Sequence, residues 1–152
     1  MIEHHKARRL ALQGLCCLDV RGQDALAETL EFIVDGRENP QTQAEAEAML
    51  RGAFQARDQA DRLINRESHD WNVGRMALVD RNILRLGVWE LLAGRRTRKV
   101  AIDEAVRLAK EFSSAESGRF VNGVLDAVAR GLRETKKNAS DPHRDSEEPR
   151  QE

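Results

Sequence analysis

Few residues in this sequence are spaced for catalysis or for metal binding. The four histidines are scattered, and the two cysteines, Cys16 and Cys17, are adjacent rather than separated as metal ligands or a redox pair would be. The sequence contains no phosphate-binding glycine loop, no G-x-S-x-G nucleophile motif and no H-E-x-x-H zinc motif. Because no nucleophile is placed beside a base, the sequence predicts a protein that is not an enzyme and that uses no cofactor and no metal.

Glu90 is the carboxylate with the most unusual surroundings, because the segment around it, residues 80–94, is apolar on nearly every side. Burial raises the pKa of a carboxyl group, and such a group can act as a catalytic acid or base. The alternative is a buried carboxylate that is paired with a nearby arginine. We favour this alternative, because buried charges in proteins are normally paired.

The basic residues near the start of the chain allow another kind of chemistry, the binding of phosphate groups. Lys6, Arg8 and Arg9 lie in a helical pattern in which Ala7 and Leu10 point inward, so Arg8 and Arg9 are expected to point outward. The formal net charge is only −1, however, whereas proteins that hold nucleic acid by charge alone are strongly basic. RNA contact would therefore come from a local patch and gain from a basic partner. The alternative is that these residues form only a solvated N-terminus.

The composition indicates the elements that must position these residues. Charged residues make up 34% of the 152 residues and aromatic residues 4%, with three prolines and no tyrosine, which is typical of a helical protein. No apolar run approaches the roughly 18 residues of a membrane span, and the N-terminus lacks the apolar core of a signal peptide. We therefore expect a cytoplasmic all-α protein without membrane contact, folded as a compact bundle of about seven helices.

The apolar periodicity places these helices along the chain. Helices are expected over residues 6–20, 24–34, 39–64, 80–93, 101–112 and 114–134, with a short helical turn over 71–76. The third of these is expected to be one long helix. The periodicity breaks near residues 67–70, which predicts two helical subdomains, about 1–67 and 71–134, within one domain spanning 1–134. Residues 135–152 carry charges and prolines without periodicity, and we expect a disordered tail there.

The stretch "GRFVNGVLDAVARGL", residues 118–132, combines two opposing signals. Asn122-Gly123 is typical of a hairpin turn, yet the apolar residues around it keep helical spacing. We favour a continuous helix. Glycine inside a helix costs about 1 kcal/mol relative to alanine. A second stripe of mostly small residues predicts a reason for this cost, which is the close approach of a neighbouring helix or an RNA at Gly123. Gly14 and Gly87 predict similar close approaches in the first and central helices.

Three segments resemble a known family. The stretches "DRNILRLGVWELL", "KVAIDEAVRLAKEF" and "ESGRFVNGVLD" closely resemble the C-terminal half of the NusB family of transcription antitermination proteins, from Trp71 to about Asp126. The stretch "KARRLALQGL" resembles the arginine-rich first helix of the family. The family often carries an aromatic residue in this helix where the present chain has Cys16.

The resemblance implies a function in RNA binding. Family members bind the boxA element of ribosomal RNA transcripts as a heterodimer with the ribosomal protein NusE, and the pair joins the RNA polymerase elongation complex and suppresses termination. Carried over to this chain, the partner surface includes Asp80 and Arg81. The RNA-binding residues are Lys6, Arg8, Arg9, Gln13, Glu116, Arg119, Phe120 and Asn122. The free protein is expected to be a monomer or a homodimer.

Two other functions remain open from the sequence. One is a helical protein–protein adaptor without RNA activity. The other is an accessory RNA-binding domain, because a similar helical domain precedes the catalytic domain of some ribosomal RNA cytosine methyltransferases. This second alternative requires a cofactor-binding domain downstream. Phe120 and Gly123 also have a structural alternative, which is packing between helices rather than contact with a ligand.

Overall fold

The computed structural model describes residues 1–35, 37–69 and 71–139, and within them the all-α prediction is confirmed. In this part of the chain no strand forms, and no helix is long and apolar enough to cross a membrane. The helices are α1 His4–Arg21, the short 3-10 helix η1 Gln23–Ala25, α2 Leu26–Asp35, α3 Pro40–Gln55, α4 Arg57–Glu67, the 3-10 helix η2 Val73–Arg75, α5 Leu78–Ala93, α6 Arg98–Phe112 and α7 Ala115–Ala139.

Local sequence explains where several helices begin and end. Gly22 and Gly94 end α1 and α5 with positive φ angles of 87° and 63°, a region that favours glycine because it has no Cβ. Asn39 caps α3, and its side-chain oxygen accepts a hydrogen bond from the backbone N–H of Thr42 at 2.8 Å. Pro40 follows at the first helical position, where its missing N–H costs nothing.

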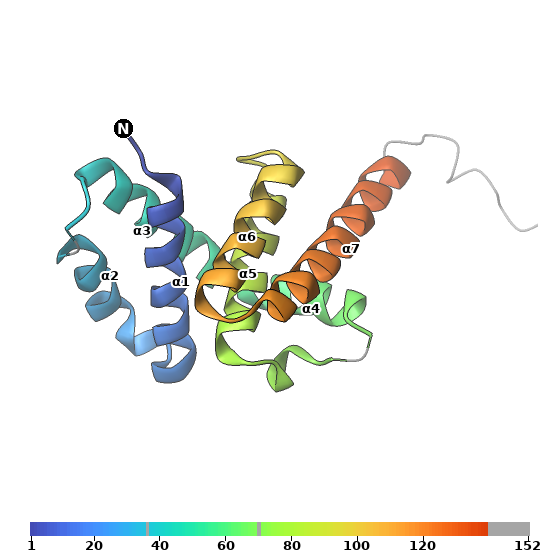
Figure 1. Cartoon of the computed structure of the whole chain (residues 1–152), viewed down its shortest axis with the longest axis horizontal. Coiled ribbons are helices and arrows are strands. Elements are labelled where there is room, and N and C mark those ends of the chain that lie inside the picture. Colours follow the sequence, from blue (N-terminus) through green and yellow to red (C-terminus); the bar gives the residue numbers. More distant parts are fainter. Residues whose placement is uncertain (36, 70, 140–152) are drawn as a thin grey trace, which may run out of the picture.

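The helices form two groups that share α5 (Figure 1). Helices α1, α2 and α3 pack together, and α4, α6 and α7 pack on α5 or on one another. Helix α5 also contacts α1 and α3, which explains why it is apolar on nearly every side. The largest side chains that are fully buried come from both groups and include Leu50, Ile64, Leu84 and Leu125. The core is therefore continuous across the molecule.

The single long helix expected over 39–64 is wrong, because the chain turns at Ala56 and forms α3 and α4 instead. The Arg57 guanidinium donates to the Phe54 backbone oxygen at 2.7 Å and stacks 4.0 Å from the centre of the Phe54 ring, which stabilises the bend. Beyond it, α4 packs mainly on α5 and α7. Apolar periodicity continues across the bend because both helices are amphipathic. The subdomain division near residues 67–70 stays a prediction.

Helix α7 passes through Asn122-Gly123 without interruption, as the periodicity predicts. The close approach expected at Gly123 is wrong for a neighbouring helix, since a Cβ there would meet nothing within 4 Å. The close contact lies instead at Gly87 of α5, where a Cβ would lie 2.7 Å from Leu125 of α7. A Cβ on Gly14 would similarly lie 2.9 Å from Leu50, so the close approaches predicted at Gly14 and Gly87 are confirmed.

The C-terminal end of α7 also differs from the expectation. The helix continues to Ala139 rather than ending near Glu134, so residues 135–139 are helical and not part of a disordered tail. Residues such as Lys136 and Lys137 favour this extension, because cations stabilise the last turn of a helix. The remainder of the predicted tail, residues 140–152, lies outside the described residues.

Candidate nucleic-acid and partner interface

Three of the predicted RNA-binding residues of α1 share one face of the helix. Lys6, Arg9 and Gln13 follow each other at i, i+3 and i+7, and each of them is at least partly exposed. The Lys6 Nζ forms ion pairs with Glu3 Oε2 at 3.3 Å and with Glu38 Oε2 at 3.6 Å. Arg9 makes no hydrogen bond or ion pair within the described residues, so its guanidinium is available to a ligand.

Arg8 does not belong to this face, and its predicted outward orientation is wrong. Its side chain is only 3% exposed, and its Nε donates to Glu90 Oε1 of α5 at 2.9 Å. The helix phase explains this position, because Arg8 precedes the buried Leu12 and Leu15 by one and two turns. Arg8 therefore holds α1 against α5 and is not placed to touch RNA. Its Nη2 is buried and has no hydrogen-bond partner within the described residues.

Glu90 is the buried, arginine-paired carboxylate that the sequence analysis favours over a catalytic acid. Burial raises the pKa of Glu90 above its ordinary value, and the charge and hydrogen bond of Arg8 partly oppose this rise. Glu104 of α6 lies 3.8 Å from Arg8 Nη1 and completes the surroundings of the guanidinium. The three side chains tie α1, α5 and α6 together.

The predicted RNA-binding residues of α7 form a second, largely exposed face. Glu116, Arg119 and Phe120 lie around Gly123 within about 60° of its direction on the helix, and Asn122 lies beside Arg119. Arg119 makes no hydrogen bond or ion pair within the described residues. Because no atom covers the position of a Gly123 Cβ, the helix backbone is open to a flat ligand at this point.

A hollow between α5 and α7 brings residues of the two predicted surfaces together. Asp80, from the predicted partner surface, lines it together with Glu116 and Phe120 from the predicted RNA surface. The hollow has a volume of about 320 Å³, and its remaining lining residues are Trp71, Arg75, Met76, Ala77 and Ser117. We call it the α5–α7 hollow.

Asp80 has one oxygen without a partner in the α5–α7 hollow. Its Oδ2 accepts a hydrogen bond from Ser117 Oγ at 3.2 Å, whereas its Oδ1 is buried and has no hydrogen-bond partner within the described residues. A buried acceptor without a partner is costly, so a donor supplied by a ligand would be favoured here. Trp71, whose surface is 56% exposed, adds a large aromatic face to the same hollow.

Arg81 follows Asp80 in the sequence but points to a different part of the molecule. Its Nε donates to Asp19 Oδ2 of α1 at 2.6 Å, and its side chain is 22% exposed. The structure therefore brings Asp80 to the predicted RNA-binding residues of α7 and engages Arg81 in an ion pair within the fold.

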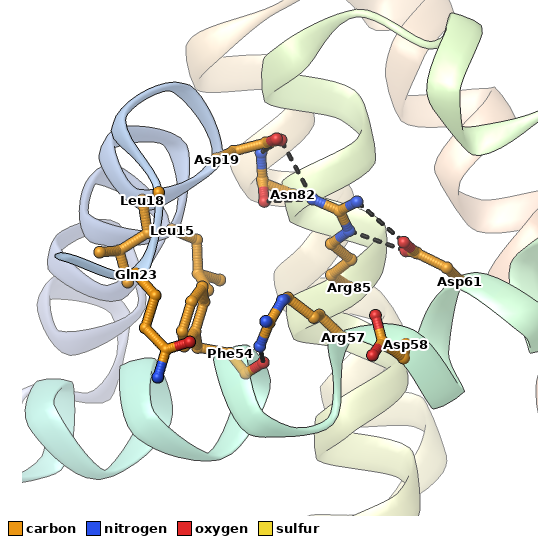
Figure 2. A pocket seen from close by; sticks show the side chains of 11 residues that line it. Leu15, Leu18, Asp19, Gln23, Phe54, Arg57, Asp58, Asp61, Asn82 and Arg85 are labelled. Carbon is orange, nitrogen blue, oxygen red and sulfur yellow. Dashed lines mark hydrogen bonds and ion pairs between the residues drawn. The ribbon is translucent and has the colours of Figure 1, made fainter. Parts of the chain in front are cut away.

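The Asp19 carboxylate belongs to a cluster of charges that joins α1, α4 and α5 (Figure 2). Arg85 lies between Asp19 and Asp61, donating to Asp61 Oδ1 at 2.7 Å and to Asp19 Oδ2 at 3.0 Å. Asn82 Nδ2 also donates to Asp19 Oδ2 at 2.8 Å. Burial alone would raise the pKa of Asp19, but the hydrogen bonds from Arg81 and Asn82 lower it below its ordinary value. The adjoining hollow, of about 200 Å³, is lined by three aspartates and two arginines together with uncharged residues.

Sequence reasoning missed Trp71, Arg75 and Ser117 as members of the site. Trp71 lies just after the break in periodicity, and Ser117 lies among short polar residues, so neither carries a signal that identifies its neighbours. Cys16, at the position where the family often has an aromatic residue, is half-buried, and burial raises the pKa of its thiol to about 11. Within the described residues no group of three or more histidine, cysteine or acidic side chains is arranged to hold a metal ion.

Comparisons with known proteins show similarity along most of the chain. The NusB family model matches residues 5–130. The transcription antitermination protein NusB of Symbiobacterium thermophilum is 43% identical to this chain. The alignment covers 87% of this chain and 92% of the relative. The solved structure of T. maritima NusB covers 86% of this chain and 93% of its own, with a TM-score of 0.77 and 33% identity. A chain from the crystal structure of the antitermination factors NusB and NusE in complex with dsRNA covers 86% of this chain and 99% of its own, with a TM-score of 0.74 and 27% identity. The family match, the identity and the shared fold together show that this chain belongs to the NusB family.

Proposed function

We propose that this protein is an RNA-binding transcription antitermination factor that binds boxA-type RNA together with the ribosomal protein NusE. Through this pair it joins the RNA polymerase elongation complex in the cytoplasm and supports ribosomal RNA transcription and maturation, without catalysing a reaction. The observation that carries the proposal is the α5–α7 hollow, in which Asp80 lies beside Glu116 and Phe120. A relative of this chain occurs in a structure with NusE and dsRNA, which supports both partners.

The RNA side of the proposal depends on few charges. Arg9 and Arg119 make no ion pair within the described residues, and Gln13 adds an exposed hydrogen-bonding side chain between the phosphate contacts. Arginine binds phosphate through paired N–H groups, and Phe120 and the open backbone at Gly123 suit an unstacked base. With a net charge of −1, the protein alone is expected to bind RNA weakly and to gain affinity from a basic partner.

The partner side depends on the unpaired oxygen of Asp80. A donor from NusE that reaches Asp80 Oδ1 would satisfy this buried atom, and an apolar side chain could pack on Trp71. Because Glu116 and Phe120 line the same hollow, bound NusE and bound RNA would be neighbours. This proximity supports joint binding of the two partners.

Fluorescence anisotropy with a boxA-like RNA, with and without NusE, tests the RNA side. Replacing Arg9 and Arg119 together by alanine should weaken RNA binding. It should also lower the slope of log affinity against log salt concentration by up to about 1.4, because each single-strand phosphate contact contributes roughly 0.7. The control is the double replacement of Arg21 and Arg51 by alanine, since both arginines are exposed and held in local ion pairs on other surfaces. Unchanged affinity of the Arg9 and Arg119 variant at every salt concentration would remove both arginines from the RNA surface. Absence of RNA binding by the parent, with and without NusE, would favour an adaptor without RNA activity.

Calorimetric titration with NusE tests the partner side. Asp80→Asn keeps the shape of the side chain and removes its charge, so NusE affinity should fall at least about tenfold, as for a desolvated charge pair at an interface. Asp103→Asn, an exposed aspartate on α6, is the matched control and should bind NusE as the parent does. Equal affinities for the parent and both variants would remove Asp80 from the interface.

A further inference from the structure

The far end of α7 forms a second basic surface, separate from the predicted RNA face near Gly123. Buried residues in α7 end at Ala129, and the helix continues to Ala139 with exposed side chains beyond Leu132 (Figure 1). The first turn of α6 lies beside the middle of α7, because Arg98 of α6 contacts Asp126 of α7. We call this region the distal cationic surface and define it by Arg98, Lys99, Arg130, Arg133, Lys136 and Lys137.

Positive charge exceeds negative charge on the distal cationic surface. Its six cations face three carboxylates, Asp103, Asp126 and Glu134, in a chain whose formal net charge is −1. Asp126 is shared by two of the cations, since Arg98 contacts its Oδ1 and Arg130 Nε lies 3.5 Å from its Oδ2. The hydrogen bond from Arg98 and the charges of Arg130 and Arg133 lower the pKa of Asp126. Even without Lys137, five cations remain against these three carboxylates within the described residues.

Helix dipoles explain only part of this surface. Lys136 and Lys137 lie in the last turn of α7, where cations are favoured by the negative end of the helix. Arg98 and Lys99 lie in the first turn of α6, which carries no acidic residue and where the helix dipole disfavours positive charge. Cations at a position that the helix dipole disfavours are suited to an anionic ligand.

A hollow between α6 and α7 joins Arg98 and Lys99 of the distal cationic surface to the predicted RNA face. Asn122, a predicted RNA-binding residue, lines a hollow of about 490 Å³ together with Arg98 and Lys99. Asn122 and Asp103 also line a second hollow along α6, which reaches Arg107 and Lys110. From Asn122 to Arg133 the helix extends about 16 Å, which a short stretch of nucleic-acid backbone can span.

We propose that the distal cationic surface binds the phosphate backbone of single-stranded RNA that continues beyond the segment held at α1 and the start of α7. The hollow beside Arg98 and Lys99 receives the strand, and Arg130 and Arg133, which follow Asp126 along α7, contact its phosphates without selecting bases. The proposal deepens the proposed function and rests on it, because it assigns the RNA a longer path across the same protein.

The test compares two RNAs, a boxA-like core and the same core with a short oligouridine extension at either end. The parent protein, bound to NusE, should hold one of the extended RNAs more tightly than the core. The double variant Arg130→Ala with Arg133→Ala should bind the core as the parent does and lose the gain from the extension. The loss of two phosphate contacts should lower the slope of log affinity against log salt concentration by about 1.4. The difference in affinity between the parent and the variant should then change about sevenfold between about 50 and 200 mM salt.

Controls separate this proposal from its alternatives. The double replacement of Arg21 and Arg51 by alanine should keep the gain from the extension, because these exposed arginines lie on other surfaces. The proposal is overturned if neither extension increases the affinity of the parent, or if the Arg130 and Arg133 variant weakens the core and the extended RNA equally. It is also overturned if this variant binds all RNAs normally but loses binding to RNA polymerase, which would assign the surface to an acidic protein.

The failure of the proposed function has a different signature. If the parent fails to bind the boxA-like core both with and without NusE, the proposed function fails. In that case binding of oligouridine alone, and its loss in the Arg130 and Arg133 variant, would still support phosphate binding at the distal cationic surface. Absence of oligouridine binding as well would overturn both proposals.

Discussion

The first and the last helix carry basic residues in different ways. In α1, Arg8 is bound to Glu90, Arg21 to Glu28 and Lys6 to Glu3 and Glu38. The neighbouring His5 lies between Glu104 and Glu111, at 3.0 and 2.7 Å. In α7, Arg119 and Arg133 are exposed, and Arg130 shares Asp126 with Arg98.

The difference shows that a basic helix is not automatically a nucleic-acid surface. Arg8 and Arg9 are adjacent in the sequence, yet one is buried in an ion pair with a residue 82 positions away and the other has no partner within the described residues. A cation that already satisfies a buried carboxylate cannot bind phosphate without leaving that carboxylate unpaired. Arg8 therefore positions α1, whereas Arg119 and Arg133 of α7 are exposed and make no ion pair within the described residues.

The largest expected effect comes from Arg8. Arg8→Met should lower the free energy of unfolding by about 3–5 kcal/mol, because it leaves the Glu90 carboxylate buried without a partner. Arg9→Met is the matched control and should change it by less than about 0.5 kcal/mol. Urea unfolding measures both values. Similar effects of the two substitutions would show that Arg8 is not the residue that anchors α1.

The pH dependence of the Arg8→Met variant sharpens this test. Without the guanidinium, the already raised pKa of Glu90 should rise further. A folded-state pKa above the unfolded value gives stability that is fully present below the unfolded pKa and lost as pH rises through the folded pKa. The destabilisation by Arg8→Met, relative to the parent, should therefore shrink as the pH is lowered through the folded-state pKa of Glu90 in the variant.

Asp19, at the other end of α1, has a lowered pKa where Glu90 has a raised one, so its contribution to stability depends on pH in the opposite direction. Its folded-state pKa is lowered, so its contribution is present above the unfolded value of about 3.9 and is lost as pH falls through the folded pKa. Asp19→Asn should cost about 1.5–3 kcal/mol at neutral pH, the range for hydrogen bonds to a charged group. Urea unfolding at several acidic pH values should also show a shallower loss of stability than in the parent. Asp58→Asn, an exposed aspartate at the same hollow, serves as control, and an equal cost for it would contradict the role of Asp19.

Two glycines test how α7 packs on the rest of the molecule. Gly87→Ala should destabilise the fold by about 1–3 kcal/mol, because the new Cβ would lie 2.7 Å from a Leu125 methyl group. Gly123→Ala should stabilise it by up to about 1 kcal/mol, since the position is open and alanine favours a helix. Thermal unfolding of the two variants gives the comparison. A destabilised Gly123→Ala would show that this face of α7 is covered.

The smallest effect is expected at Arg133. Arg133→Ala removes an exposed side chain, so the free energy of unfolding should change by no more than about 0.5 kcal/mol. Urea unfolding at low and high salt measures this change. A clear loss of stability would mean that the end of α7 contributes to the fold through its charges, as α1 does, and the contrast between the two helices would disappear.

The sequence by itself determined the helical class, the continuity of α7 through Asn122-Gly123 and the helix ends at Gly22 and Gly94. These features depend on apolar periodicity and on the conformational freedom of single residues, which are local properties of the chain. It also determined that Glu90 is a buried carboxylate paired with an arginine, because an apolar segment leaves few other possibilities for such a charge.

Only the tertiary structure decided which residues meet. It assigned Arg8 to Glu90, turned the chain at Ala56, left Gly123 without a neighbouring helix and placed Asp80 beside Phe120. The reason is that periodicity indicates which side of a helix is apolar but not how far that helix rotates or slides against its neighbours. The side chains of neighbouring helices interlock when they pack, and this packing selects one arrangement of each pair.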